Sequence, residues 1–476
     1  MTAAPVDLDR SGIGGHPRGL STLFFTEMWE RFSYYGMRAL LLLFMVAPVA
    51  KGGLGFETPV AAGIYGLYTG SVYFTAIPGG WIADRLLGLR RAVLVGGVLI
   101  ALGHYCLAVH AVPSFFVGLG LIIAGTGLLK PNISSIVGEL YGEDDPRRDS
   151  GFSIFYMGIN LGAFISPLVC GYLGQKIGWH WGFGAAGVGM TLGVFQYVLG
   201  AGRLGRAGLP QGPLGGGVLW AKVIAAVVGL CGGLYLLWDR RDVVVLVGTA
   251  VLFAWLLRQA APGVERKRIG AIIVLFVFAT LFWAGFEQAG SSLNLFADQR
   301  TRNTLFGWDF PSSWYQSVQP LFIILLAPAF AWLWLKLGRF EPSSPAKFAY
   351  GLLFVGLGFL VVAVGAWLQA REGGALVSPM WLILVYLLHT LGELSLSPVG
   401  LSTVTKLAPP RMVGLMMGVW FLALSLGNFI GGGIAGFFGR FPLPELFGAV
   451  FLTTAASALV LAMLVKPIRG LMAGVH

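Results

Sequence analysis

Charged residues and cysteines are scarce in this 476-residue chain. Only 11% of the residues are charged and 56% are hydrophobic, whereas a soluble domain carries about a quarter of charged residues. Together with a mean hydropathy of +0.79, this composition excludes an ordinary soluble protein and indicates an integral membrane protein. The three cysteines, Cys106, Cys170 and Cys231, lie within or beside apolar runs, which predicts core filling rather than a disulfide framework, and their positions give no metal-site spacing.

Motifs for hydrolytic or ATP-driven chemistry are also absent. The chain contains no H-E-x-x-H, no G-x-S-x-G and no G-K-S/T sequence, so we expect neither an enzyme nor a bound cofactor. No pattern typical of a cleaved signal peptide precedes the first apolar run. The net charge of +11 does not indicate nucleic-acid binding, because the basic residues are scattered between apolar runs.

What the sequence does contain is a series of apolar runs long enough to cross a bilayer as helices. They predict an all-α protein with fourteen transmembrane helices, at about 20–49, 58–83, 91–112, 114–139, 150–175, 180–202, 216–237, 243–260, 269–296, 315–336, 347–369, 378–405, 411–437 and 444–466. With both termini on one side, about 21 basic residues fall in the loops of that side and about 8 in the opposite loops. This asymmetry predicts that both termini are cytoplasmic.

The runs at 216–237 and 243–260 differ from the others. They are short, they are joined by the charged turn W-D-R-R-D, and segments rich in glycine, proline or charge flank them. We interpret them as a helical hairpin that links two bundles of six helices. The predicted domains are an N-terminal bundle at 1–202, a linker with two extra helices at 203–268 and a C-terminal bundle at 269–476.

A polar stripe lies inside the first apolar run. At helical spacing, one face carries Glu27, Glu30, Arg31, Tyr34, Tyr35 and Arg38. A helix lying on the membrane surface is the alternative, but A-L-L-L-L-F-M-V-A follows directly and continues the run across the bilayer. Each ionisable group at membrane depth costs about 2.5–3.5 kcal/mol unless it is paired or hydrated, so this face should line a polar cavity.

Several motifs show a resemblance to known transporters. G-G-W-I-A-D-R-L-L-G-L-R-R (79–91) is similar to the cytosolic loop signature of the major facilitator superfamily, and we expect nearby arginine to match its Asp84. More specifically, the chain resembles the proton-dependent oligopeptide transporter family. The segments that carry this resemblance are E-M-W-E-R-F-S-Y-Y-G (27–36), K-P-N-I-S-S (130–135), F-S-I-F-Y-M-G-I-N-L-G-A-F (152–164), F-W-A-G-F-E-Q (282–288), G-E-L-S-L-S-P-V-G (392–400) and M-M-G-V-W-F-L (416–422).

This resemblance implies a role for each matched residue. Proton coupling falls to Glu27, Glu30, Arg31, Lys130 and Glu287, with Lys130 placed against the first-span carboxylates. Arg38 and Glu287 form a proton-sensitive bridge between the bundles and, with Asp84, take part in gating. Glu393 holds the amino terminus of a peptide with Asn160 beside it, while Arg38 and Lys130 hold the carboxyl terminus. The pocket aromatics are Tyr34, Tyr35, Tyr73, Trp283, Phe286 and Trp420, whereas His389 and His104 are expected in the core.

The resulting hypothesis is a proton-coupled symporter that imports di- and tripeptides by alternating access, as a functional monomer in a bacterial inner membrane. Gln319 stands where the family usually has asparagine, which leaves the preferred peptide length open. The alternatives are the same fold carrying another small anion, such as nitrate or an amino-acid conjugate, a membrane-embedded enzyme and a channel. Glu393 argues against a simple anion, which would need no carboxylate to hold an amino group.

Overall fold

Helices make up nearly all of the computed structural model, which describes residues 9–142, 145–210, 214–219, 221, 222, 225, 241–305 and 307–475. Most of the predicted span at 216–237, with Cys231, lies outside these residues. The helices are α1 (Arg18–Val46), α2 (Thr58–Phe74), α3 (Ala76–Ile82), α4 (Leu89–Ala108), α5 (Val112–Glu139), α6 (Arg148–Tyr172), α7 (Trp179–Gly200), α9 (Arg241–Gln259), α10 (Val264–Phe286), α11 (Ser292–Gln299), α12 (Val318–Leu337), α13 (Ser344–Arg371), α14 (Met380–Leu407), α15 (Val413–Ala435) and α16 (Leu443–Leu471). A short hairpin pairs β1 (Thr304–Leu305) with β2 (Trp308–Asp309).

The protein is a multi-pass membrane protein. In the described residues, eleven helical segments are long and apolar enough to cross a bilayer. Helix α1 has 29 residues but carries the polar stripe, and α9 adds a further apolar helix. Large apolar side chains face outward along the helices; Phe195, Leu335 and Leu452, for example, are 64%, 84% and 65% exposed. Only a lipid environment covers such a surface favourably, so the all-α membrane class is confirmed.

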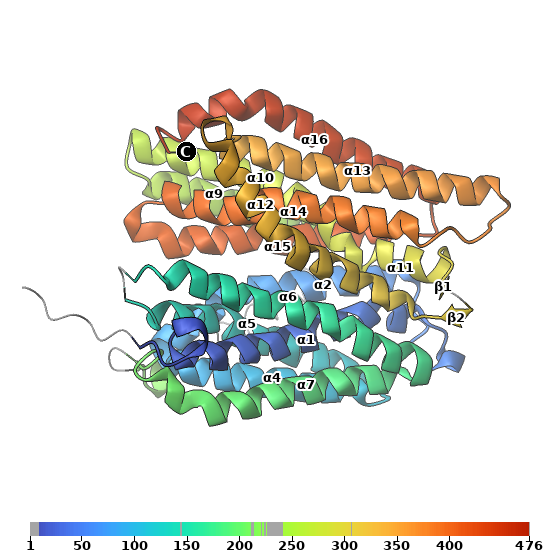
Figure 1. The fold of residues 1–476 in the computed structure, drawn as a ribbon, viewed down its shortest axis with the longest axis horizontal. Coiled ribbons are helices and arrows are strands. Elements are labelled where there is room, and N and C mark those ends of the chain that lie inside the picture. Colours follow the sequence, from blue (N-terminus) through green and yellow to red (C-terminus); the bar gives the residue numbers. More distant parts are fainter. Residues whose placement is uncertain are drawn as a thin grey trace, which may run out of the picture.

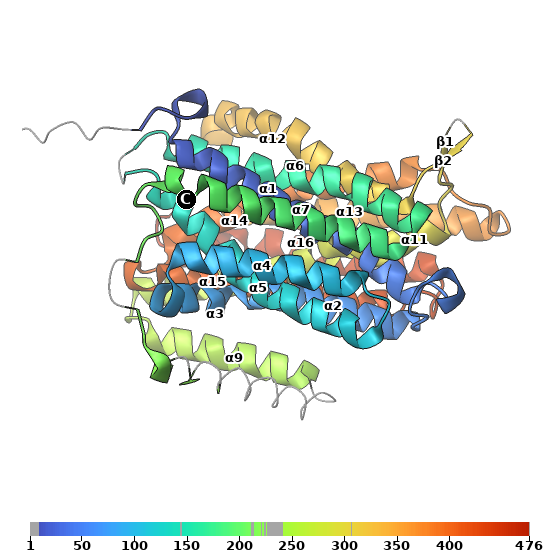
Figure 2. The same cartoon turned by 90° about the horizontal axis from the view of Figure 1, so that it is seen from below.

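The helices form two layers that meet along the centre of the molecule. In Figure 1, α1, α2 and α4–α7 lie in the lower layer and α10 and α12–α16 in the upper one. In Figure 2, α9 lies to one side of the other labelled helices. The two layers are called the N half and the C half below. The C-terminus of the chain and the start of α1 lie at one end of the molecule, the terminal end, and the β1–β2 hairpin lies at the other, the hairpin end.

Two predicted spans are interrupted in the structure. The span predicted at 269–296 is broken after Phe286, because a tight turn at Glu287–Gly290 separates α10 from α11. The span at 58–83 is likewise divided at Thr75 into α2 and α3. The first break matters for function, since it places Glu287 at a helix end in the middle of the molecule and not within a continuous helix.

The two halves touch closely toward the hairpin end. Helices α2 and α15 cross where an added Cβ on Gly66 would lie 2.9 Å from the Cα of Gly432, so these positions require glycine for the close approach. Near the same crossing, Ser425 Oγ donates a hydrogen bond of 2.8 Å to the carbonyl of Gly70. At the terminal end, the N half contributes the last turn of α5 and the first turn of α6, and the C half contributes the last turn of α14 and the first turn of α15. Among the described residues, no hydrogen bond joins these turns of one half to those of the other.

The segment before α1 is fixed to the loop between α5 and α6. Arg147 Nη1 donates to the carbonyl of Gly15 at 2.5 Å, and its Nη2 lies 2.7 Å from Asp145 Oδ2. His16 Nδ1 and Tyr141 Oη are 2.9 Å apart and buried. These contacts hold the start of the chain against the terminal end of the N half.

Candidate functional site

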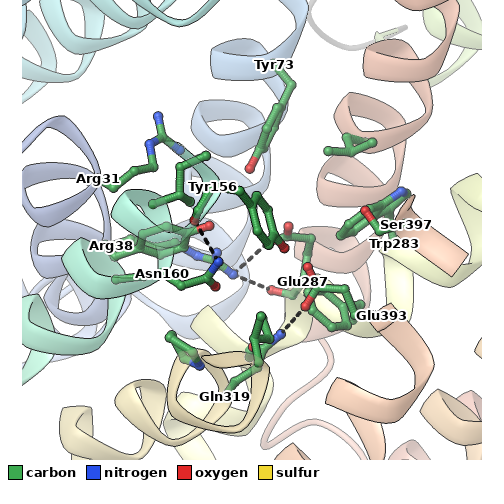
Figure 3. A pocket seen from close by; sticks show the side chains of 18 of the residues that line it. Arg31, Arg38, Tyr73, Tyr156, Asn160, Trp283, Glu287, Gln319, Glu393 and Ser397 are labelled. Carbon is green, nitrogen blue, oxygen red and sulfur yellow. Dashed lines mark hydrogen bonds and ion pairs between the residues drawn. The ribbon is translucent and has the colours of Figure 1, made fainter. Parts of the chain in front are cut away.

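A cavity of about 450 Å³ lies between the two halves at the level where Glu287 interrupts its helix. Figure 3 shows the side chains that converge on it. Of the predicted site residues, those that line it are Arg31, Tyr35, Arg38, Tyr73, Lys130, Asn160, Trp283, Glu287, Gln319, Glu393 and Trp420. The cavity is therefore built by helices of both halves, and both charge signs face into it.

The cavity opens toward the terminal end. At its hairpin side, Arg38 and Glu287 are each only 5% exposed. Two turns along α14 from Glu393, Leu401 also lines the cavity and is 41% exposed. Together with the close contacts between the halves toward the hairpin end, this gradient of exposure describes a site that is closed at one end and accessible from the other.

The first-span stripe folds into a compact charge cluster. Arg31 makes an ion pair with Glu30, its Nη2 donating to Glu30 Oε1 at 2.5 Å, and Arg31 Nε lies 3.5 Å from Glu27 Oε1. All three side chains are at most 2% exposed. Two carboxylates thus share one guanidinium, and the second oxygen of Glu27 has no hydrogen-bond partner among the described residues. Burial of such an imbalance is costly unless a proton or another cation compensates it.

The resemblance places Lys130 against the first-span carboxylates, and among the described residues the ion pairs of Glu27 and Glu30 are with Arg31. In the described part of the chain Lys130 has no ion pair; its Nζ lies 4.4 Å from the ring centroid of Tyr73 and faces the cavity. Arg31, one residue from Glu30 and one turn from Glu27, pairs with both carboxylates, so the ion pairs of this cluster lie within α1. Lys130 is left as an ammonium group that a ligand can reach, stabilised by the face of an aromatic ring.

The outer wall of the cavity is an ion pair between the halves. Arg38 Nη2 lies 2.7 Å from Glu287 Oε2, and Arg38 Nε donates to Tyr65 Oη at 2.7 Å. Both charged side chains are 6% exposed, so the pair is screened little by solvent. Tyr65 was not predicted, because nothing in its sequence context distinguishes it from an aromatic residue of the core.

On the opposite wall, α12 and α14 are joined by one hydrogen bond. Gln319 Nε2 donates to Glu393 Oε2 at 3.0 Å, and the other oxygen of Glu393 remains available (Figure 3). Asn160 turns its amide back onto its own helix, where Nδ2 donates to the carbonyl of Tyr156 at 3.0 Å. Glu393 is therefore the carboxylate of this wall that is free to accept from a ligand.

The aromatic residues divide between the cavity and the core. Tyr35, Tyr73, Trp283, Phe286 and Trp420 line the cavity, whereas Tyr34 does not. The indole nitrogen of Trp283 is buried without a hydrogen-bond partner among the described residues. The structure adds lining residues that the motifs did not single out: Tyr156, Ile159, Ile323, Ser397, Leu401, Phe421 and Leu424. They share only an apolar or small character, which sequence spacing cannot separate from a lipid-facing or core position.

Asp84, His104 and His389 are among the predicted residues that do not line the cavity. Asp84 is exposed at the terminal end and has no hydrogen bond or ion pair among the described residues; the nearby Arg90 instead donates to the carbonyls of Gly205 and Ala207, both at 2.7 Å. The expected match of Asp84 with arginine is thus not observed. His104 is fully buried, and His389 is 1% exposed between the rings of Phe286 and Phe359, as expected for core residues.

Comparison with known proteins places this architecture. The family model described as POT family matches residues 90–225 and 239–450. The peptide transporter YePEPT of Yersinia enterocolitica is 43% identical, over 96% of this chain and 96% of that protein. The di-/tripeptide transporter of Lactococcus lactis subsp. cremoris is 39% identical, over 97% of this chain and 98% of that protein.

Solved structures agree with this assignment. A crystal structure of a peptide transporter POT in complex with sulfate has 44% sequence identity and a TM-score of 0.90, and the match covers 98% of each chain. The predicted fold, two six-helix bundles with an insertion between them, is confirmed by this likeness. The family model covers well over half of the chain and the relatives match it almost end to end. The chain therefore belongs to the POT family.

Proposed function

We propose that this protein is a proton-coupled symporter that imports di- and tripeptides by alternating access. The observation that carries the proposal is the placement of complementary charges on opposite walls of one cavity. Lys130 of the N half has no carboxylate partner among the described residues, and Glu393 of the C half has a free carboxylate oxygen. A zwitterionic peptide fits such a pair of charges. The Yersinia and Lactococcus relatives of this chain are named peptide transporters.

The peptide would lie across the cavity with its amino terminus on Glu393 and its carboxylate on Lys130. Arg38 is held by Glu287 and Tyr65, so it would join Lys130 only after that ion pair loosens. Asn160, Gln319 and the aromatic residues Tyr35, Tyr73, Trp283 and Trp420 would position the backbone and side chains. Most of the remaining lining is apolar, which suits many different side chains while the two charged ends set the orientation.

Proton coupling would arise in the cluster of Glu27, Glu30 and Arg31. A proton on one of the two carboxylates removes the excess negative charge of the cluster and weakens its hold on Arg31. The potential at Lys130 then becomes more positive, so a proton and a peptide carboxylate favour each other. Breakage of the Arg38–Glu287 pair would in turn remove one of the contacts that hold the halves together toward the hairpin end.

The proposed setting is a bacterial inner membrane with the terminal end in the cytoplasm, so the structure corresponds to an inward-open state. We keep the division into an N-terminal bundle at 1–202, a linker at 203–268 and a C-terminal bundle at 269–476, and we propose a functional monomer. Asp84 keeps its proposed gating role, which would require an arginine partner in another state of the cycle.

The test is uptake of a labelled dipeptide into proteoliposomes under an imposed inward proton gradient. Wild type should concentrate the peptide, and Glu30→Gln should lose gradient-driven uptake while it retains exchange of internal for external peptide. A channel would instead conduct in both assays after this substitution. Uptake of nitrate but not of peptide would contradict the assigned substrate class.

A further inference from the structure

Gln175 joins the two halves toward the hairpin end at a further place, away from the crossing of α2 and α15. It lies in the turn Leu173–Ile177 that ends α6. Its Nε2 donates to Ser312 Oγ at 2.8 Å and to Asp298 Oδ1 at 3.3 Å, and its Oε1 accepts from the backbone N–H of Ser313 at 3.0 Å. One side chain of the N half thus makes three hydrogen bonds to the C half.

The C-half partners are themselves tied together. Ser312 Oγ donates to Asp298 Oδ1 at 2.7 Å, which connects the turn Ser312–Ser317 to α11. Further along the same turn, Ser317 Oγ donates to the carbonyl of Phe164 on α6 at 2.7 Å. The turn therefore lies along α6, and the Gln175 amide makes its hydrogen bonds to the first residues of the turn.

Glycine makes this approach possible. A Cβ added to Gly171 of α6 would collide with the Ser313 side chain, which is fully buried at the contact. Any larger residue there would push the turn away from α6. The contact depends on both a specific set of hydrogen bonds and a specific close fit, so two independent perturbations can open it.

We propose that Gln175 is a gating residue of this transporter: together with Asp298, Ser312 and Ser313 it forms a latch that holds the hairpin end closed. This rests on the proposed function, because alternating access requires α6 to separate from α11 and the 312–317 turn when the hairpin end opens. The latch shares no residue with the Arg38–Glu287 pair and joins different helices. The closed hairpin end is therefore also held at a position separate from the ion pair, and release of the ion pair alone leaves the latch intact.

The experiment measures the distance between two spin labels across the hairpin end in lipid nanodiscs without peptide. Labels on Glu57→Cys and Glu372→Cys, both at exposed positions in opposite halves, are introduced after replacement of the three native cysteines. The test variants are Gln175→Ala, which removes the three hydrogen bonds, and Gly171→Val, which removes the close fit. The controls are Lys176→Ala, whose side chain has no described hydrogen bond or ion pair, and Gly184→Val, where an added Cβ meets nothing within 4 Å.

We expect both test variants to raise the ratio of the long-distance to the short-distance population by roughly ten-fold, the effect of losing about one charge-assisted hydrogen bond, while both controls match wild type. A merely structural role would lower the thermal midpoint without moving this distance. Wild-type distance distributions in both Gln175→Ala and Gly171→Val would overturn the proposal. Dipeptide uptake by wild type is measured in parallel: if no peptide is carried but the distances shift, the latch stands and the proposed substrate falls.

Discussion

Replacement of Glu393 by glutamine tests the proposed peptide pose at its most specific point. Glutamine keeps the size of the side chain and can still accept the hydrogen bond that Gln319 donates at 3.0 Å, so the link between α12 and α14 survives. What disappears is the negative charge offered to a peptide amino group. A hydrogen bond to a charged group contributes about 1.5–3 kcal/mol, so the dissociation constant of a dipeptide should rise roughly 10- to 150-fold.

The assay compares two ligands on two proteins in detergent by calorimetry. Dialanine carries a charged amino terminus, and N-acetyl-dialanine carries none but keeps the carboxylate. Wild type should prefer dialanine, and Glu393→Gln should lose affinity for dialanine while its affinity for the acetylated peptide hardly changes. The coupling between the two changes isolates the interaction of Glu393 with the amino group. Equal losses for both ligands, or no loss for dialanine, would refute the proposed orientation.

Three further substitutions give distinct outcomes. Glu287→Gln should lower stability by about 3–5 kcal/mol, because it leaves the buried Arg38 without its counter-charge, and the thermal midpoint reports this. Lys130→Ala should weaken dipeptide binding at least ten-fold in titration calorimetry with an unchanged thermal midpoint, because Lys130 has no ion pair to lose in the part of the chain that the structure describes. Arg147→Ala should accelerate trypsin cleavage before α1, because the anchor of that segment is removed. Hydrogen bonds from Arg147 hold the pKa of Asp145 below its usual value. The anchor is therefore fully present above the ordinary aspartate pKa and is lost only as the pH falls below that pKa. Wild-type cleavage, corrected for the activity of trypsin, should be flat between about pH 6 and 8.

Each of these has a matched control. Glu57→Gln removes a charge from an exposed position and should leave the thermal midpoint unchanged. A dipeptide amidated at its carboxyl terminus should bind wild type and Lys130→Ala equally, since it lacks the group that the lysine holds. Arg148→Ala, next to Arg147, should leave the rate of trypsin cleavage near wild type. A fall in midpoint for Lys130→Ala, or unchanged cleavage in Arg147→Ala, would contradict the corresponding interpretation.

The sequence was informative where polar residues interrupt apolar runs. The spacing of Glu27, Glu30, Arg31 and Arg38 placed them on one helical face, and the cost of burying charge required that face to meet partners within the protein. The structure shows such partners. The number and order of the membrane helices followed from composition and length in the same way. Neither argument depends on the relative positions of distant helices.

The remaining features depend on three-dimensional geometry, partly within one helix and partly between helices. Arg31 and Lys130 were both available to pair with Glu27 and Glu30, and only the geometry of α1 decides for Arg31, whose side chain reaches both carboxylates on its own helix. The tight turn at Glu287–Gly290 has no proline, and Ser291 at its end takes a backbone conformation with φ −124° and ψ −97° that no sequence signal announced. The contacts of Gln175 and Tyr65 become apparent only when α6 is placed against the C half and α2 against α1.

The pairing of both first-span carboxylates with Arg31, and not with Lys130, changes how coupling must work. If Lys130 were locked to a first-span carboxylate, a proton would have to break that pair before a peptide could bind. With Lys130 set against the Tyr73 ring and without an ion pair among the described residues, the carboxylate of a peptide can reach it directly, and the proton acts through the charge of the cluster around Arg31. Peptide affinity should then fall gradually as the external and internal pH rise together, without a threshold at which binding is abolished. Binding of dialanine to wild type, measured as the pH is raised, decides between the two arrangements. Glu30→Gln is the variant expected to flatten the slope of affinity against pH. An all-or-none loss of binding in wild type would favour the locked pair.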